Sequence, residues 1–147
     1  MDNIRHRVGI KANVKDVFEA VHHPNKLTGW WATKAAGGTD LGSQVELEFP
    51  GYPKFVWEIA ELSVNERVCL NFIAGPEPWS GSELIFELDE AEAQVFVTLT
   101  HVTVTETPKE AFLFFCTKWP LFLVSLKEFL ETGVGKPYPN DIRIQHD

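Results

Sequence analysis

The strongest hydrophobic pattern in the chain lies in residues 108–132, PKEAFLFFCTKWPLFLVSLKEFLET. Pro108 suits the first turn of a helix, and Gly133 suits the left-handed residue that ends one. A helix this long and this apolar needs a curved partner to cover it, so we expect a sheet wrapped around it. The apolar residues follow the i, i+3, i+4, i+7 spacing of a helix with one buried face: Phe112, Phe115, Cys116, Trp119, Phe122, Leu123, Leu126, Phe129 and Leu130.

Pro120 lies inside this helical pattern. Proline removes one backbone donor, and its ring clashes with the carbonyl four residues earlier, here that of Cys116, at a cost of roughly 3 kcal/mol in a straight helix. We therefore expect a kink near residues 116–120, or two helices in series. A packing adjustment explains such a bend better than a functional hinge does.

Upstream of this helix, the alternation of apolar and polar residues predicts about six strands. Two short helices are expected between the first two strands, the earlier one capped by Asn13 and the later one opened by Pro24. Residues 32–43 are rich in small and turn-forming residues and predict a loop. The pattern indicates an α+β fold in which a curved antiparallel sheet surrounds the C-terminal helix. The expected strands are residues 4–10, 45–49, 54–62, 67–73, 83–88 and 95–102.

Length and composition narrow the class of protein. The 147 residues suit a single domain, which we place at residues 1–137, followed by an extended or partly disordered tail at 138–147. A net charge of −8 without a basic stripe argues against nucleic acid and against an anionic membrane surface as partners. Neither a signal-peptide pattern nor an apolar run of about 18 residues is visible. We therefore expect a soluble, cytoplasmic protein.

Several segments together resemble one protein family. They are VFEAVHHPNKLTGWW after the first strand, LGSQVELEF, WSGSELIFEL, VTLTH, and the helix KWPLFLVSLKEFLETGVGKP. The chain resembles the activator-of-Hsp90-ATPase-homologue-like family of the START/Bet v 1-like (SRPBCC) superfamily, whose fold is the helix-grip. The pair Trp30–Trp31 and the terminal LKEFLETGVGKP are the most specific matches, whereas Pro120 departs from the family pattern.

The resemblance implies a cavity between the sheet and the long helix, which the superfamily uses for lipids, sterols, polyketides and other hydrophobic molecules. Five tryptophans and eleven phenylalanines are available to line it. Each aromatic side chain has packing as its alternative role, which we favour for Trp57 and Trp119. Trp79, in a Pro/Gly loop, is a candidate for the cavity mouth, and one of Trp30 and Trp31 is expected to cap the cavity. The candidate cavity residues are Trp30, Trp31, Trp57, Phe72, Trp79, Phe86, His101, Phe112, Phe115 and Trp119.

His101 follows Val97 and Leu99 at a period of two and therefore shares their face of the strand. On an inward face it would be a polar group in an apolar pocket, able to orient a ligand or to act as a base. The alternative, which we favour, is a hydrogen-bonded histidine near a strand end.

Other evidence for a catalytic, metal or cofactor site is weak. The chain has no GxSxG elbow, P-loop or dinucleotide-binding glycine pattern. His22 and His23 are adjacent rather than spaced as metal ligands. Cys69 and Cys116 lack CxxC spacing and are expected to be small buried hydrophobes in a reducing compartment. We therefore predict no catalytic residue, no metal and no cofactor.

Three functions remain open. The first is non-enzymatic binding of a small hydrophobic ligand, and it leads because of the aromatic content and the resemblance. The second is an enzyme of the polyketide cyclase or dehydratase type, with His101 and a carboxylate as acid and base. The third is a chaperone-interacting, stress-response module, as the family name implies. The protein is expected to be a monomer or a homodimer.

Overall fold

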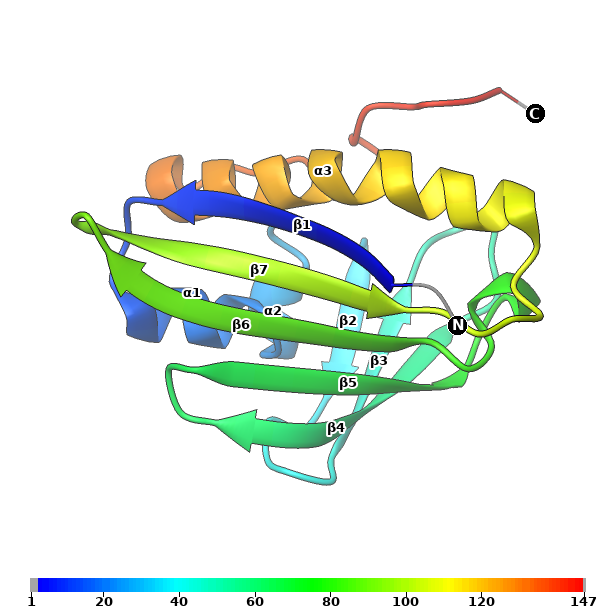
Figure 1. The fold of residues 1–147 in the computed structure, drawn as a ribbon, viewed down its shortest axis with the longest axis horizontal. Coiled ribbons are helices and arrows are strands. Elements are labelled where there is room, and N and C mark those ends of the chain that lie inside the picture. Colours follow the sequence, from blue (N-terminus) through cyan, green and yellow to red (C-terminus); the bar gives the residue numbers. More distant parts are fainter. Residues whose placement is uncertain (1–2, 147) are drawn as a thin grey trace.

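One antiparallel sheet curves around one long helix in the computed structural model, which describes residues 3–146 (Figure 1). Residues 1, 2 and 147, which we assigned to the domain and to the tail, lie outside the described residues. The seven strands are ordered β1-β7-β6-β5-β4-β3-β2. Along the chain the elements are β1 (Asn3–Ile10), α1 (Val14–Ala20), α2 (Pro24–Leu27), β2 (Lys34–Gly37), β3 (Gln44–Glu48), β4 (Phe55–Ser63), β5 (Arg67–Ala74), the 3-10 helix η1 (Glu77–Trp79), β6 (Glu83–Ala91), β7 (Gln94–Val102) and α3 (Lys109–Thr132).

The predicted helix-grip architecture is confirmed, with one strand more than expected. All six expected strands and both short helices are present, and most of the strand ends lie within one or two residues of the predicted ones. The additional strand is β2, which lies at the sheet edge and pairs antiparallel with β3, from Lys34 opposite Glu48 to Gly37 opposite Val45. Its KAAG sequence has neither β-branched residues nor apolar alternation, so no local signal separates it from a loop.

Helix α3 is continuous through Pro120, so the prediction of two helices in series is wrong. The helix packs on the sheet on both sides of the proline, through Phe115 and Trp119 before it and Phe122 after it, all nearly fully buried. Burial of such side chains stabilises by about 1.5–3 kcal/mol each, which offsets the cost of one interior proline. Gly133 ends the helix at φ 87° and donates its N–H to the carbonyl of Phe129 at 2.9 Å.

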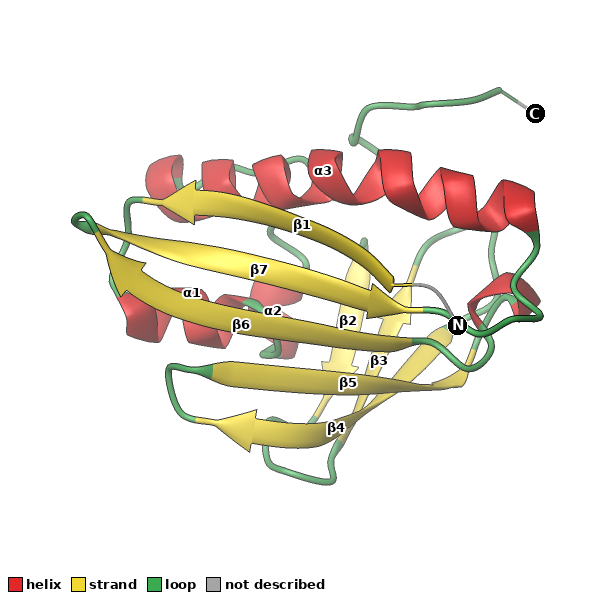
Figure 2. Ribbon diagram, viewed as in Figure 1, coloured by secondary structure: helices red, strands yellow, loops and turns green. Residues whose placement is uncertain are grey.

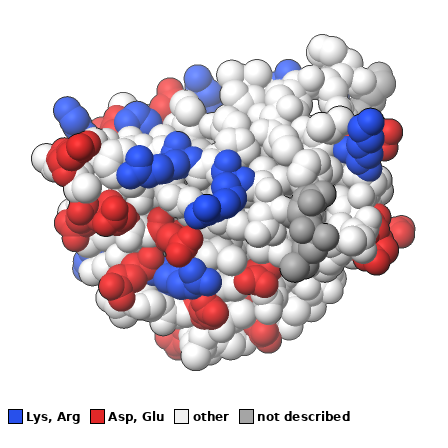
Figure 3. Space-filling model, in the orientation of Figure 1, with Lys and Arg blue, Asp and Glu red and all other residues white. Residues whose placement is uncertain are grey.

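The core lies between the concave face of the sheet and helices α1, α2 and α3 (Figure 2). Alternate residues of β3, β4 and the first half of β6 are buried, as the expected period of two requires. On the opposite face, charged side chains of β1, β5 and β6 gather over one part of the sheet, whereas β7 carries none (Figure 3). Arg67 there contacts Glu61 at 2.6 Å and Glu87 at 3.0 Å, and these exposed pairs contribute little to stability.

Residues 133–146, called here the C-terminal segment, form neither helix nor strand and run back along α3 (Figure 1). The Ser125 hydroxyl donates to the carbonyl of Trp30 at 2.8 Å and accepts from the Lys136 N–H at 2.7 Å. The backbone N–H of Tyr138 donates to the carbonyl of Trp31 at 3.0 Å, and Thr33 Oγ1 donates to the carbonyl of Tyr138 at 2.6 Å. The first part of the segment is therefore fixed to the helix and to the Trp30–Trp31 turn.

None of the helices within residues 3–146 is long and apolar enough to cross a membrane.

Candidate ligand-binding pocket

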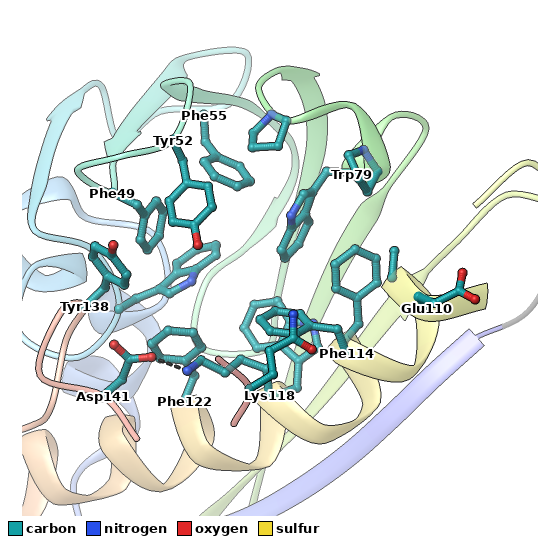
Figure 4. A pocket seen from close by; sticks show the side chains of 17 residues that line it. Phe49, Tyr52, Phe55, Trp79, Glu110, Phe114, Lys118, Phe122, Tyr138 and Asp141 are labelled. Carbon is teal, nitrogen blue, oxygen red and sulfur yellow. Dashed lines mark ion pairs between the residues drawn. The ribbon is translucent and has the colours of Figure 1, made fainter. Parts of the chain in front are cut away.

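A pocket of about 390 Å³ lies between the N-terminal half of α3, the β3–β4 end of the sheet, η1 and the C-terminal segment (Figure 4). It therefore occupies the space between sheet and long helix that the resemblance pointed to. Side chains from five separate parts of the chain converge on it: Trp31, Phe49, Tyr52, Phe55, Pro76, Pro78, Trp79, Glu110, Ala111, Phe114, Phe115, Lys118, Trp119, Phe122, Tyr138, Asp141 and Gln145.

The walls are aromatic rings that hold one another in place. Trp79 lies 4.5 Å from Phe115 and 5.2 Å from Phe55, measured between ring centroids. Trp31 lies 5.5 Å from Trp119 in the same measure. Ring pairs at these separations and tilted angles are the favourable arrangement for aromatic side chains. The pocket is therefore already formed without a ligand, and its walls are rings packed against one another.

The polar groups of the pocket are few and lie at distinct positions. Lys118 of α3 forms an ion pair with Asp141 of the C-terminal segment, and its Nζ also donates to the carbonyl of Ile142 at 2.7 Å. The Tyr138 hydroxyl donates to the carbonyl of Pro50 at 2.9 Å. Glu110 lies at the other end of the row of α3 side chains shown in Figure 4. A mostly apolar cavity with a few placed polar groups is typical of small-molecule sites.

The structure brings some of the candidate cavity residues to this pocket and not others. Trp31, Trp79, Phe115 and Trp119 line it. Phe72 and Phe112 are partly buried and pack against the core without lining the pocket. The remaining candidates lie in the core with almost no exposed surface: Trp30, Trp57, Phe86 and His101.

The two adjacent tryptophans both point inward, which corrects the expectation that one of them would cap the cavity. Trp30 is fully buried and donates Nε1–H to the carbonyl of Ala20 at 2.8 Å. The Trp31 ring stacks on it at 5.5 Å and turns its other side toward the pocket. Stacking allows two neighbouring rings to share the interior, a geometry that sequence spacing alone does not reveal. Trp79, in η1, lines the pocket wall between Phe55 and Phe115.

His101 faces inward, as its spacing predicted, but both ring nitrogens are engaged. Trp119 donates its Nε1–H to His101 Nδ1 at 3.0 Å, so Nε2 carries the proton and donates to Ser82 Oγ at 2.8 Å. Burial lowers the pKa of His101 from 6.5 to about 4, which keeps the ring neutral at physiological pH. The Trp79 and Phe115 rings cover it at 5.1 and 4.7 Å.

The expected pairing of His101 with a carboxylate as acid and base is not seen among the described residues. Its partners are a serine and a tryptophan, and burial is the cause of its pKa shift. The acceptor nitrogen is occupied and the ring has no exposed surface, so His101 does not face the pocket directly. The alternative that we favoured, a hydrogen-bonded histidine near a strand end, describes it.

Cys69 is not a candidate nucleophile. The Cys69 thiol is buried, and burial together with the neighbouring Glu83, 3.2 Å away, raises its pKa to about 12. Cys116 is only half-buried, so the expectation that both would be fully buried is corrected for this residue. Among the side chains of residues 3–146, no three His, Cys, Asp or Glu residues are grouped as metal ligands.

Several pocket residues escaped the sequence analysis. Lys118 follows Phe114 and precedes Phe122 at helical spacing, so a lysine on the apolar stripe of the helix was the available signal. Phe49 directly follows β3 and Phe55 begins β4, on either side of the PGYP turn, and the alternation of the two strands made their inward direction predictable. Tyr138, Asp141 and Gln145 come from the C-terminal segment. This segment has no periodic hydrophobic pattern from which their place in the pocket could be predicted.

An antiparallel sheet wrapped around a C-terminal helix, with an apolar pocket between them, defines a protein of the helix-grip, START/Bet v 1-like class. The chain belongs to the activator of Hsp90 ATPase homolog 1-like family, whose model matches residues 11–131. No protein with a curated description matches the chain in sequence.

Solved structures of similar proteins agree with this assignment. The Aha1 dimer from Colwellia psychrerythraea is 36% identical, with a TM-score of 0.80 over 92% of this chain and 100% of that one. SSP2350 from Staphylococcus saprophyticus is 22% identical, with a TM-score of 0.76 over 91% and 95%. CalU16 from Micromonospora echinospora is 21% identical, with a TM-score of 0.75 over 99% and 75%. The last two show a shared fold only.

Proposed function

We propose that the protein binds a small hydrophobic ligand in the pocket between the sheet and α3, without transforming it. The observation that supports this most strongly is the preformed aromatic cavity of about 390 Å³. Ligand pockets typically have volumes of roughly 300–1,000 Å³ and mostly apolar walls with a few polar groups. The pocket suits a molecule of two or three fused or linked rings, or a medium-length aliphatic chain.

An enzyme of the polyketide cyclase or dehydratase type has less support. His101 is closed off from the pocket, and the lysine and aspartate in the wall neutralise each other. Apart from Lys118 and Asp141, the residues that line the pocket do not include an acidic and a basic side chain within hydrogen-bond distance of each other.

Association with another protein is a second candidate, supported by the 36% identical relative, which is a dimer. A chaperone as partner rests on the family description alone. The large apolar side chains that are exposed within residues 3–146 come from α3, β5, loops and the C-terminal segment. They are Leu41, Tyr52, Val64, Ile73, Leu113, Val124, Val134 and Ile142.

Filling the pocket tests the proposed function. Ala111 lines the pocket, and replacing it by tryptophan places a large ring in the ligand volume. We expect Ala111→Trp to weaken binding of the neutral fluorescent probe phenylnaphthylamine by at least about tenfold, equivalent to roughly 1.4 kcal/mol. The measurement is a fluorescence titration at constant protein concentration.

Leu113→Trp is the matched control, since Leu113 is on the same helix but 52% exposed. It should bind the probe as the unmodified protein does. Far-ultraviolet circular dichroism verifies that both variants are folded. Undiminished binding by folded Ala111→Trp would show that this pocket is not the ligand site.

A further inference from the structure

The pocket contains a charged group that hydrophobic binding alone does not explain. Lysine is almost never buried unless it is paired, yet the side chain of Lys118 is only 13% exposed, in a wall made mostly of aromatic rings. Its Nζ lies 5.3 Å from the centroid of the Phe122 ring. Lys118 is also the only lysine or arginine among the lining residues.

The residue paired with Lys118 belongs to neither the sheet nor a helix. Asp141 lies in the C-terminal segment, beyond the hydrogen bonds that fix Lys136 and Tyr138, and its side chain is 8% exposed. Lys118 holds this part of the segment through the Asp141 carboxylate and the carbonyl of Ile142. A carboxylate thus already sits on Lys118 at the pocket, and it is carried by a stretch of chain without regular structure (Figure 4).

We propose that the ligand is an amphiphile with one anionic group, and that this group takes the place of the Asp141 carboxylate on Lys118. This inference rests on the proposed function and specifies its ligand class. Exchange of one anion for another keeps the buried lysine paired, so the exchange avoids the large penalty of an uncompensated charge. A neutral ligand instead leaves the Lys118–Asp141 pair in place and contacts only the aromatic walls.

The position of Lys118 at one end of the pocket gives the ligand a direction. Glu110 precedes Lys118 by eight positions, which is about 12 Å along a helix axis. An anionic group is attracted to Lys118, whereas Glu110 is exposed and its carboxylate points away from the aromatic rings, so water screens its charge (Figure 4). The apolar body of the ligand then extends from Lys118 toward Trp79 and Pro78, which line the pocket as well.

Two fluorescent probes with the same ring skeleton separate charge from hydrophobicity. Anilinonaphthalene sulfonate is anionic, whereas phenylnaphthylamine lacks the sulfonate. We expect Lys118→Met to weaken binding of the anionic probe by about tenfold while binding of the neutral probe changes by less than about twofold. Asp141→Asn removes the internal competitor and should strengthen binding of the anionic probe by about three- to tenfold, again with little effect on the neutral one.

Lys15→Met and Asp89→Asn are matched controls that change the net charge equally at exposed positions outside the pocket. Both should bind the two probes as the unmodified protein does. Equal weakening of both probes by Lys118→Met, or no gain of anion binding in Asp141→Asn, overturns the anionic-ligand inference while leaving hydrophobic binding intact. Failure of the unmodified protein to bind either probe overturns the proposed function itself.

Discussion

Acidification from pH 6.5 to 4 is expected to lower the free energy of unfolding by about 3 kcal/mol through His101 alone. The pKa of His101 falls from 6.5 to about 4 in the folded protein because the ring is buried. Between these values the unfolded chain binds the proton and the folded chain does not, so stability rises with pH across this window. The contribution is complete above pH 6.5 and is lost progressively down to about pH 4.

Urea unfolding of the unmodified protein and of His101→Gln, at several pH values in this window, measures the effect. Glutamine keeps a polar amide at the site but does not titrate. His6 and His22 also have pKa values lowered by burial, and both proteins contain them, so the difference between the two curves isolates His101. Parallel curves would show that His101 titrates normally and that its buried hydrogen-bonded environment is wrongly described.

Replacing Trp57 by alanine should lower the free energy of unfolding by about 3–5 kcal/mol, the usual range for truncating a fully buried tryptophan. Trp57 has no exposed surface and lies directly behind the pocket wall, with its ring 5.4 Å from Phe72, 5.9 Å from Trp79 and 6.3 Å from Trp31. Its loss therefore leaves a cavity that these rigid neighbours cannot close. Equilibrium denaturation with guanidinium chloride gives the value.

Phenylalanine at this position provides a sharper comparison. Within the described residues, Trp57 Nε1 has no hydrogen-bond partner, whereas Trp30 Nε1 donates to the carbonyl of Ala20. Trp30→Phe therefore leaves a buried carbonyl unsatisfied and should cost about 1–3 kcal/mol more than Trp57→Phe. If the two substitutions were equally destabilising, the indole N–H of Trp57 would have a partner that this structure lacks.

The sheet and the long helix were predictable because their side chains repeat with a fixed period. Val97, Leu99 and His101 share the inner face of β7 as the period of two required. The edge strand β2 carries no such period, and its pairing with β3 depends on tertiary context rather than on its own residues. The continuity of α3 through Pro120 likewise depends on burial on both sides of the proline, which local propensity does not include.

The pocket was less predictable than the fold. Aromatic content identified Trp31, Trp79, Phe115 and Trp119 among its lining residues, but composition cannot tell a wall from a core, as Trp57 shows. The hydrogen bonds of His101 are made to residues 19 and 18 positions away, so its local sequence gave no indication of them. The C-terminal segment contributes lining residues because the chain reverses direction after Gly133 and runs back along α3. The spacing of hydrophobic residues does not predict this reversal.

Native mass spectrometry of the purified protein, paired with denaturing mass spectrometry of an organic extract, tests the central claim most directly. We expect a co-purifying hydrophobic molecule at one per chain, which carries an acidic group and is released on denaturation. A bare chain mass, together with no stabilisation by a panel of fatty acids and aromatic acids and their neutral analogues, would contradict it.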